Sequence, residues 1–227
     1  SYPLISQGVP RSEANEKVEE VARILGITEL LDKRVGGLSG GDRQRVALGR
    51  AIVRDPKCFL MDEPLGALDA EFREYMAEEL RALHNRMGAT TVYVTHDQLE
   101  AMQMGDKIVV MNHGVIEQFG RPQDIYDKPA TLFVAEFIGS PPMNFLRFEG
   151  ALEAGAETVR MHHESLPVPV QREAFEGQMV YGVRPEHVRF SDTSRYRGEV
   201  LAVEYLGTTQ IVTLHTPDGE LKARVPS

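Results

Sequence analysis

Residues 38–51 read LSGGDRQRVALGRA, in which a serine and two glycines lead directly into a basic run with helical character. The first turn of a helix leaves four backbone N–H groups free, and the helix dipole is positive there. Glycines let the backbone approach an anion closely, and the Ser39 hydroxyl adds a donor. The stretch therefore predicts a phosphate-binding helix start, although a plain glycine turn with a serine cap would read the same way.

The composition narrows the class of protein. The 227 residues carry a formal net charge of −9 at pH 7 and are 42% hydrophobic, which fits one or two globular domains. The acidic balance disfavours a nucleic-acid groove, because phosphate backbones need a surplus of Lys and Arg. The single cysteine excludes a disulfide within the chain. No apolar run approaches the roughly 20 residues of a membrane helix.

Two acidic residues end an apolar stretch at 58–64, CFLMDEP. The stretch reads as a short strand buried on both faces, as in a parallel sheet. Placing the charges of Asp62 and Glu63 beside a buried strand would cost free energy unless a binding partner or a reaction required them. In phosphoryl-transfer enzymes one acid holds Mg²⁺ and another residue orients the attacking water. Two solvated acids at a strand end remain the alternative.

Two further polar residues occupy similar positions. His96, in YVTHDQ at 93–98, follows a strand at the end where α/β sheets bind ligands. Its imidazole could donate to a phosphate oxygen, but a surface histidine would fit equally well. Asp69, in GALDA at 66–70, is also open to two interpretations, because an ordinary helix N-cap would place an aspartate there.

Strands and helices alternate to about residue 120, which predicts an α/β layered domain. Helices are expected over about 12–25, 41–55 and 67–88. Residues 139–145, GSPPMNF, read as a linker or domain edge. The β-rich pieces after them predict a small all-β barrel.

The motifs are far more specific together than singly. Asp62 lies 23 residues after Ser39, and His96 lies 34 residues after Asp62. In this order and spacing, residues 1–140 resemble the ATP-binding subunits of ABC transporters, with the ABC signature, Walker B strand, D-loop and H-loop. The continuation over 106–146 is similar to the ATPases of sugar and sn-glycerol-3-phosphate importers, the maltose-importer type.

The resemblance implies a fold and cofactors. The fold would be that of an α/β P-loop NTPase, with a helical subdomain over about 3–56 and the rest of the catalytic core over about 57–140. A small OB-like regulatory domain of the TOBE type, truncated at its end, would occupy 141–227. The cofactors would be ATP and Mg²⁺.

Roles for the residues after the two strands follow from the same resemblance. Asp62 would assist Mg²⁺, and Glu63 would be the general base that orients the attacking water. His96 would contact the γ-phosphate. Asp69 would help to join two subunits.

The signature residues would serve a second subunit. Ser39, Gly40 and Gly41 would contact the γ-phosphate of an ATP held mainly by the other subunit. Asp42 stands where the family usually has glutamine. Its carboxylate should weaken the attraction for a phosphate unless it points away or caps the helix start.

The phosphate loop of the family, G-x-x-x-x-G-K-S/T, does not occur in the 227 residues. We therefore expect the chain to be a fragment that lacks the Walker A region and is inactive alone. The implied partners are a second ATPase subunit, as a homodimer, the transmembrane permease subunits and, indirectly, a periplasmic or extracellular solute-binding protein. No nucleic acid is expected, and the implied location is peripheral, on the cytoplasmic face of the plasma membrane.

The implied function is ATP hydrolysis at composite sites of a head-to-tail dimer, which powers uptake of a sugar, polyol or glycerol-phosphate solute. Two alternatives stay open. One is a non-transport ABC ATPase of DNA repair or translation, and the other is a non-catalytic regulatory remnant. The solute cannot be read from this chain, because other subunits bind it.

Overall fold

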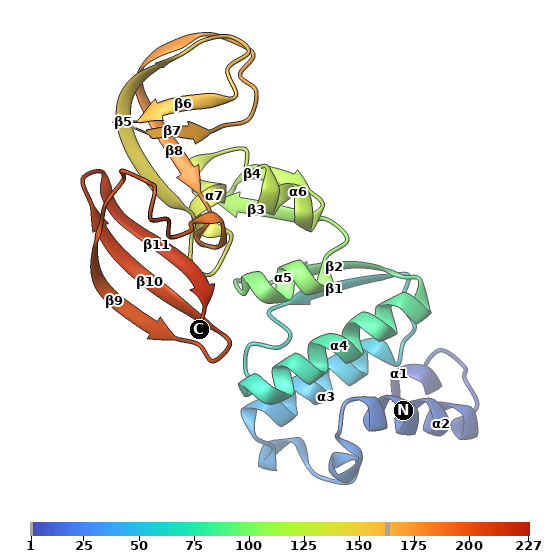
Figure 1. Ribbon diagram of the computed structural model, residues 1–227. Coiled ribbons are helices and arrows are strands. Elements are labelled where there is room, and N and C mark those ends of the chain that lie inside the picture. Colours follow the sequence, from blue (N-terminus) through green and yellow to red (C-terminus); the bar gives the residue numbers. More distant parts are fainter. Residues whose placement is uncertain (1, 162–163) are drawn as a thin grey trace. The chain divides into compact units, whose positions relative to one another are not determined.

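The chain forms two compact units, residues 1–108 and 109–227 (Figure 1). The computed structural model describes residues 2–161 and 164–227, with Met87 described by its backbone alone. The division falls earlier than the predicted boundary at 140/141. The reason is that the segment after residue 108 packs with the β-rich end of the chain, where Arg184 donates to the carbonyls of Tyr126 and Ala135. Each unit is described by itself below.

The first unit is mainly helical. Its helices are α1 (Tyr2–Ile5), α2 (Arg11–Ile24), α3 (Gly40–Ile52), α4 (Ala70–Met87) and α5 (Gln98–Met104), with short 3-10 turns η1 (Thr28–Leu30) and η2 (Val35–Gly37). Its strands are β1 (Cys58–Asp62) and β2 (Thr90–Val94).

Strands β1 and β2 pair in parallel, as predicted, with Asp62 opposite Val94. Helices α3 and α4 lie along one side of the pair (Figure 1), and their apolar residues share a core with Phe59. Side chains alternate along a strand, so the next residue faces the other way. Phe59 is 6% exposed and Leu60 is 81% exposed. The prediction of a strand buried on both faces is therefore wrong for the described residues, because the helices cover only one face.

Capping residues decide where three helices of this unit begin. Ser39, Asp69 and Asp97 each accept a hydrogen bond from a backbone N–H in the first turn of α3, α4 and α5. Such caps satisfy donors that a helix start would otherwise leave free. At the other end of α4, Gly88 takes a left-handed conformation with φ of 62°, which glycine adopts without a steric cost. The local sequence therefore sets where the site-bearing loops begin and end.

The second unit is mainly β. Its elements are β3 (Ile108–Asn112), β4 (Val115–Gly120), α6 (Pro122–Asp127), α7 (Leu132–Phe137), β5 (Asn144–Leu152), β6 (Thr158–Met161), β7 (Glu164–Pro167), β8 (Phe175–Val183), η3 (Pro185–His187), β9 (Glu199–Tyr205), β10 (Thr209–Thr216) and β11 (Gly219–Pro226).

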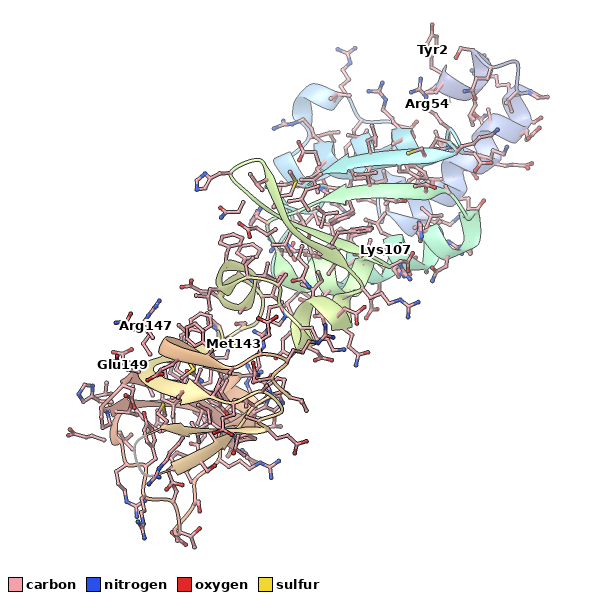
Figure 2. All side chains as sticks on the ribbon, turned by 90° about the horizontal axis from the view of Figure 1, so that it is seen from above. Tyr2, Arg54, Lys107, Met143, Arg147 and Glu149 are labelled. Atoms are coloured by element: carbon pink, nitrogen blue, oxygen red, sulfur yellow. The ribbon has the colours of Figure 1, made fainter. Side chains whose placement is uncertain are left out.

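The strands of the second unit pair antiparallel. Strand β5 pairs with β8, β6 with β7, and β10 lies between β9 and β11. Leu146 and Val212 belong to one buried cluster that joins β5 to β10. On the opposite side of β5, Arg147 and Glu149 are exposed (Figure 2). This alternation is what a small barrel with one interior produces. Among the described residues, no helix combines the length and the apolarity that crossing a bilayer requires.

Candidate active site

Glu63 lies directly after β1 with an unusual backbone. Its φ of 43° is in the left-handed region, which a residue with a side chain adopts at a cost of about 1–3 kcal/mol. Two backbone hydrogen bonds hold it there: its N–H donates to the carbonyl of Val94 at 2.8 Å, and its carbonyl accepts from the N–H of Gly66 at 3.2 Å. The backbone around this carboxylate is therefore fixed although the side chain is 53% exposed.

His96 meets Glu63 across the parallel strands. The two residues follow β1 and β2, and His96 Nδ1 lies 2.8 Å from Glu63 Oε1. Both side chains remain open to solvent, with the imidazole 77% exposed. The carboxyl edge of the sheet thus presents a proton acceptor and an imidazole side by side, as general acid–base chemistry on a bound substrate requires.

The carboxylate of Glu63 raises the pKa of His96, first through their hydrogen bond and then through its charge. A raised pKa means that the pair stabilises the folded chain fully below the ordinary histidine value of 6.5, and that this stabilisation is lost as the pH rises through the raised value.

In an NMR titration of the full-length protein, we expect a His96 midpoint above 6.5 that falls back in a Glu63→Gln variant. Glu78→Gln, at an exposed position of α4, is the control; an unchanged midpoint in Glu63→Gln would contradict the pairing.

The helix start predicted at the serine and two glycines is the N-terminus of α3. Ser39 is the N-cap, and its Oγ accepts from the N–H of Asp42 at 3.1 Å. A Cβ placed on Gly40 would meet no atom within 4 Å, whereas one on Gly41 would lie 3.4 Å from the carbonyl of Ala67. The helix start is therefore accessible at Gly40 and lies close to the loop after β1 at Gly41.

Gln44 connects α3 to that loop, a contact that sequence reasoning missed. Its Nε2 donates to the carbonyl of Glu63 at 2.8 Å, and its Oε1 accepts from the N–H of Ala67 at 3.0 Å. One side-chain amide thus satisfies two backbone groups of the segment between the base candidate and Asp69. A polar residue on a helix gives no sequence signal for such a role, because a solvated side chain would look identical.

Three family models and several curated relatives match this chain. The model of the ABC transporter family matches residues 4–66, that of the MalK OB fold domain matches 139–188, and that of the TOBE domain matches 181–227. The trehalose/maltose import ATP-binding protein MalK of Thermococcus litoralis is 48% identical over 226 residues, 94% of this chain and 61% of that protein.

Two other relatives give the same picture. The sn-glycerol-3-phosphate import ATP-binding protein UgpC of Ruegeria sp. is 46% identical, over 99% of this chain and 63% of its own length. The sulfoquinovosyl glycerol transport ATP-binding protein SmoE of Agrobacterium fabrum is 44% identical, over 99% and 64%. Over nearly its whole length, the chain is therefore similar to ATP-binding proteins of ABC transporters. It spans 61–64% of the length of these three relatives.

Asp42, in the first turn of α3, has local partners in the structure. Its carboxylate pairs with Arg45 one turn later, and Arg45 is held in turn by the carbonyl of Gly26 at 3.0 Å and by the ring of Phe72. Hydrogen bonds from Ser39, and then Arg45, lower the pKa of Asp42, so it is ionised and caps the helix start. The carboxylate therefore has local partners, which is one of the two exceptions that the sequence allowed.

The remaining candidate residues are Asp69 and Asp62. Asp69, in the ABC D-loop, is exposed and accepts from the N–H of Phe72 at 2.9 Å, so within this chain it is the N-cap of α4. Asp62 ends the Walker B strand with an exposed carboxylate, for which the described part of the chain offers no hydrogen bond or ion pair. Both side chains are exposed at the surface of this unit.

Proposed function

We propose that the full-length protein that contains this chain is the ATP-hydrolysing subunit of an importer for a sugar, polyol or glycerol-phosphate solute. The observation that carries the proposal is the Glu63–His96 pair, at 2.8 Å, on the carboxyl edge of two parallel strands of an ABC chain. The import proteins among its relatives favour transport over a role in DNA repair or translation. Because the chain spans less than two thirds of those relatives, the activity is proposed for the full-length protein.

Glu63 and His96 divide the chemistry between them. Glu63 accepts the proton of the attacking water, since its carboxylate is exposed and its backbone is fixed. His96 donates a hydrogen bond toward the γ-phosphate and orients the Glu63 carboxylate through Nδ1. Glu63 is the first residue after β1 and His96 the second after β2, so the paired strands place both close together.

Asp62 fits the role of a magnesium ligand. Mg²⁺ in nucleotide sites is usually held by one or two carboxylates together with the phosphates of the substrate, rather than by a complete protein cage. The described residues contain no group of three or more His, Cys, Asp or Glu side chains that could form such a cage. When bound, Mg²⁺ would supply charge neutralisation at the phosphate oxygens.

The start of α3 acts on a nucleotide held by a second copy in this proposal. Ser39, Gly40 and Gly41 present backbone N–H groups and a hydroxyl at an accessible helix start, which suits an anion. Two such chains related by a two-fold axis would form two composite sites, with Asp69 at their contact. We further propose permease subunits and, indirectly, a solute-binding protein as partners, and a peripheral position at the cytoplasmic face of the membrane.

The domain assignment remains part of the proposal. The ATPase portion would run to residue 140, with a helical subdomain over about 3–56, and an OB-like regulatory domain would begin at 141. The MalK OB match, which begins at residue 139, supports that boundary.

Composite sites make a prediction about mixtures of two defective variants of the full-length protein. Ser39→Arg blocks the signature, and Glu63→Gln removes the base, so each should hydrolyse ATP poorly by itself. In a mixed dimer, one site has both intact residues and the other has neither. An equal mixture should therefore recover up to about a quarter of the wild-type rate of phosphate release, if subunits exchange at random and sites act independently.

The control mixes the Glu63→Gln protein with a double variant that carries both Glu63→Gln and Ser39→Arg. No site in this mixture is intact. If the single-variant mixture is no more active than this control, the sites are not shared between subunits. If wild-type protein releases no phosphate from Mg-ATP, the hydrolytic function itself is wrong.

A further inference from the structure

A buried carboxylate lies directly behind His96. Glu100, in the first turn of α5, is 6% exposed and is the only acidic residue that the structure buries among the residues it describes. Its Oε2 accepts from the hydroxyl of Thr95 at 2.8 Å and from that of Tyr93 at 2.9 Å. Burial and the neighbouring charge of Glu100 raise the pKa of Tyr93, so its hydroxyl stays a donor. Keeping a charged carboxylate buried costs free energy even when it has such hydrogen-bond partners, which points to a functional role for Glu100.

The same carboxylate fixes the residues on both sides of His96. Thr95 Oγ1, while it donates to Glu100, also accepts from the N–H of Asp97 at 2.9 Å. Asp97 Oδ1 in turn accepts from the N–H of Leu99 at 2.8 Å and caps α5. The backbone before and after His96 is thus tied to α5, whereas the imidazole itself projects into solvent.

Arg73 of α4 brings a second loop into this network. Its Nη2 donates to the carbonyl of Leu68 at 3.0 Å, next to Asp69. On its other side, Nη1 lies 3.8 Å from Asp97 Oδ2, and Nε lies 4.0 Å from Glu100 Oε1. Nε is buried and has no hydrogen-bond partner among the described residues, so a small shift of Glu100 toward Arg73 would complete one. Arg73 therefore touches the loop before α4 and the loop that carries His96.

We propose that Arg73 and Glu100 are positioning residues for hydrolysis: through Thr95 they hold His96 against Glu63, and through Leu68 they couple that pair to the loop of Asp69. The inference rests on the proposed function, because Asp69 lies at the subunit contact only in the proposed dimer. Binding of a second subunit at Asp69 would then affect the position of His96 through the guanidinium of Arg73. Neither residue touches nucleotide in this proposal.

The central test replaces Thr95 with valine in the full-length protein, since valine keeps the shape and removes the hydroxyl. We expect kcat for ATP hydrolysis to fall about 10–100-fold, because a misplaced catalytic group is costly, with the KM for ATP changed less than about threefold. Thr95→Ser, which restores a hydroxyl, should recover most of the rate. A threonine that only stabilised the fold would not separate kcat from KM in this way.

Thr131 provides a matched control. Its hydroxyl donates to Glu117 at 3.0 Å and accepts from the N–H of Val134 at 3.3 Å, so it makes the same two kinds of bond at the start of α7, in the other unit. Thr131→Val should leave kcat within about twofold of wild type. Equal losses of kcat in Thr131→Val and Thr95→Val would overturn the proposal.

Two further measurements separate this inference from the proposed function. In a His96→Ala background, Thr95→Val should lower kcat no further, because Thr95 acts through His96; a full additional loss would overturn the proposal. The NMR titration midpoint of His96 should fall toward its ordinary value in Thr95→Val and stay unchanged in Thr131→Val. This readout needs no hydrolysis, so it decides the positioning role even if wild-type protein proves inactive on ATP.

Discussion

Replacing Glu63 with glutamine is expected to lower the rate of ATP hydrolysis by the full-length protein about 10²–10⁴-fold, the range of a positioned general base. Glutamine keeps the shape of the side chain but cannot accept the proton of the attacking water. The fold should be unaffected, because the carboxylate is 53% exposed and the bonds that hold the left-handed backbone use no atom of this side chain. Initial rates of phosphate release at saturating Mg-ATP measure the effect.

The affinity for nucleotide distinguishes loss of the general base alone from disruption of the whole binding site. We expect Glu63→Gln to bind a fluorescent ATP analogue within about threefold of wild type, since a base acts in the transition state rather than in binding. The control is Glu78→Gln, which makes the same chemical change at an exposed position of α4. A Glu63→Gln variant that hydrolyses ATP as fast as Glu78→Gln would show that another group takes the proton.

The proximity of Glu63 and His96 could be anticipated because it depends on one simple rule. Glu63 is the first residue after one apolar strand and His96 the second after the next, and the carboxyl ends of parallel neighbouring strands meet at one edge of a sheet. The register, with Asp62 opposite Val94, then brings the two side chains within hydrogen-bond distance. The N-caps at Ser39 and Asp69 could also be anticipated, because a Ser or Asp directly before a helical run can accept a hydrogen bond from a backbone N–H of the first turn.

The supporting contacts could not be anticipated, because they depend on how helices pack. Gln44, Arg73 and Glu100 are polar residues on helices, and in the sequence each resembles a solvated side chain. Only the packing of α3, α4 and α5 around the loops after β1 and β2 brings Gln44 and Arg73 to backbone carbonyls and Glu100 to the hydroxyl of Thr95. The prediction that β1 is buried on both faces was wrong at the exposed Leu60 for a related reason. The apolar sequence of a strand does not determine how many of its faces other elements cover.

The largest effect on stability is expected at Arg184, in the second unit. This guanidinium is 3% exposed, donates to the carbonyls of Tyr126 at 2.8 Å, Ala135 at 3.2 Å and Ile138, and stacks over the Tyr126 ring at 4.1 Å. Burial lowers its pKa, and no carboxylate among the described residues forms an ion pair with it. Arg184→Met keeps the apolar stem but leaves three carbonyls unpaired, each at a cost of about 1–3 kcal/mol.

Removing the buried charge offsets part of that cost, so the free energy of unfolding of this unit should fall by about 2–4 kcal/mol. Hydrogen exchange of amides in β8 and β11 measures it unit by unit, with the exposed Arg189→Met as the control. Gly139→Ala tests the same contact from the other side: its φ is 120°, and a Cβ there would lie 2.8 Å from Arg184 Nη1. If Arg184→Met and Arg189→Met change protection equally, the three carbonyls find other donors and the guanidinium does not hold α6 and α7 to the barrel.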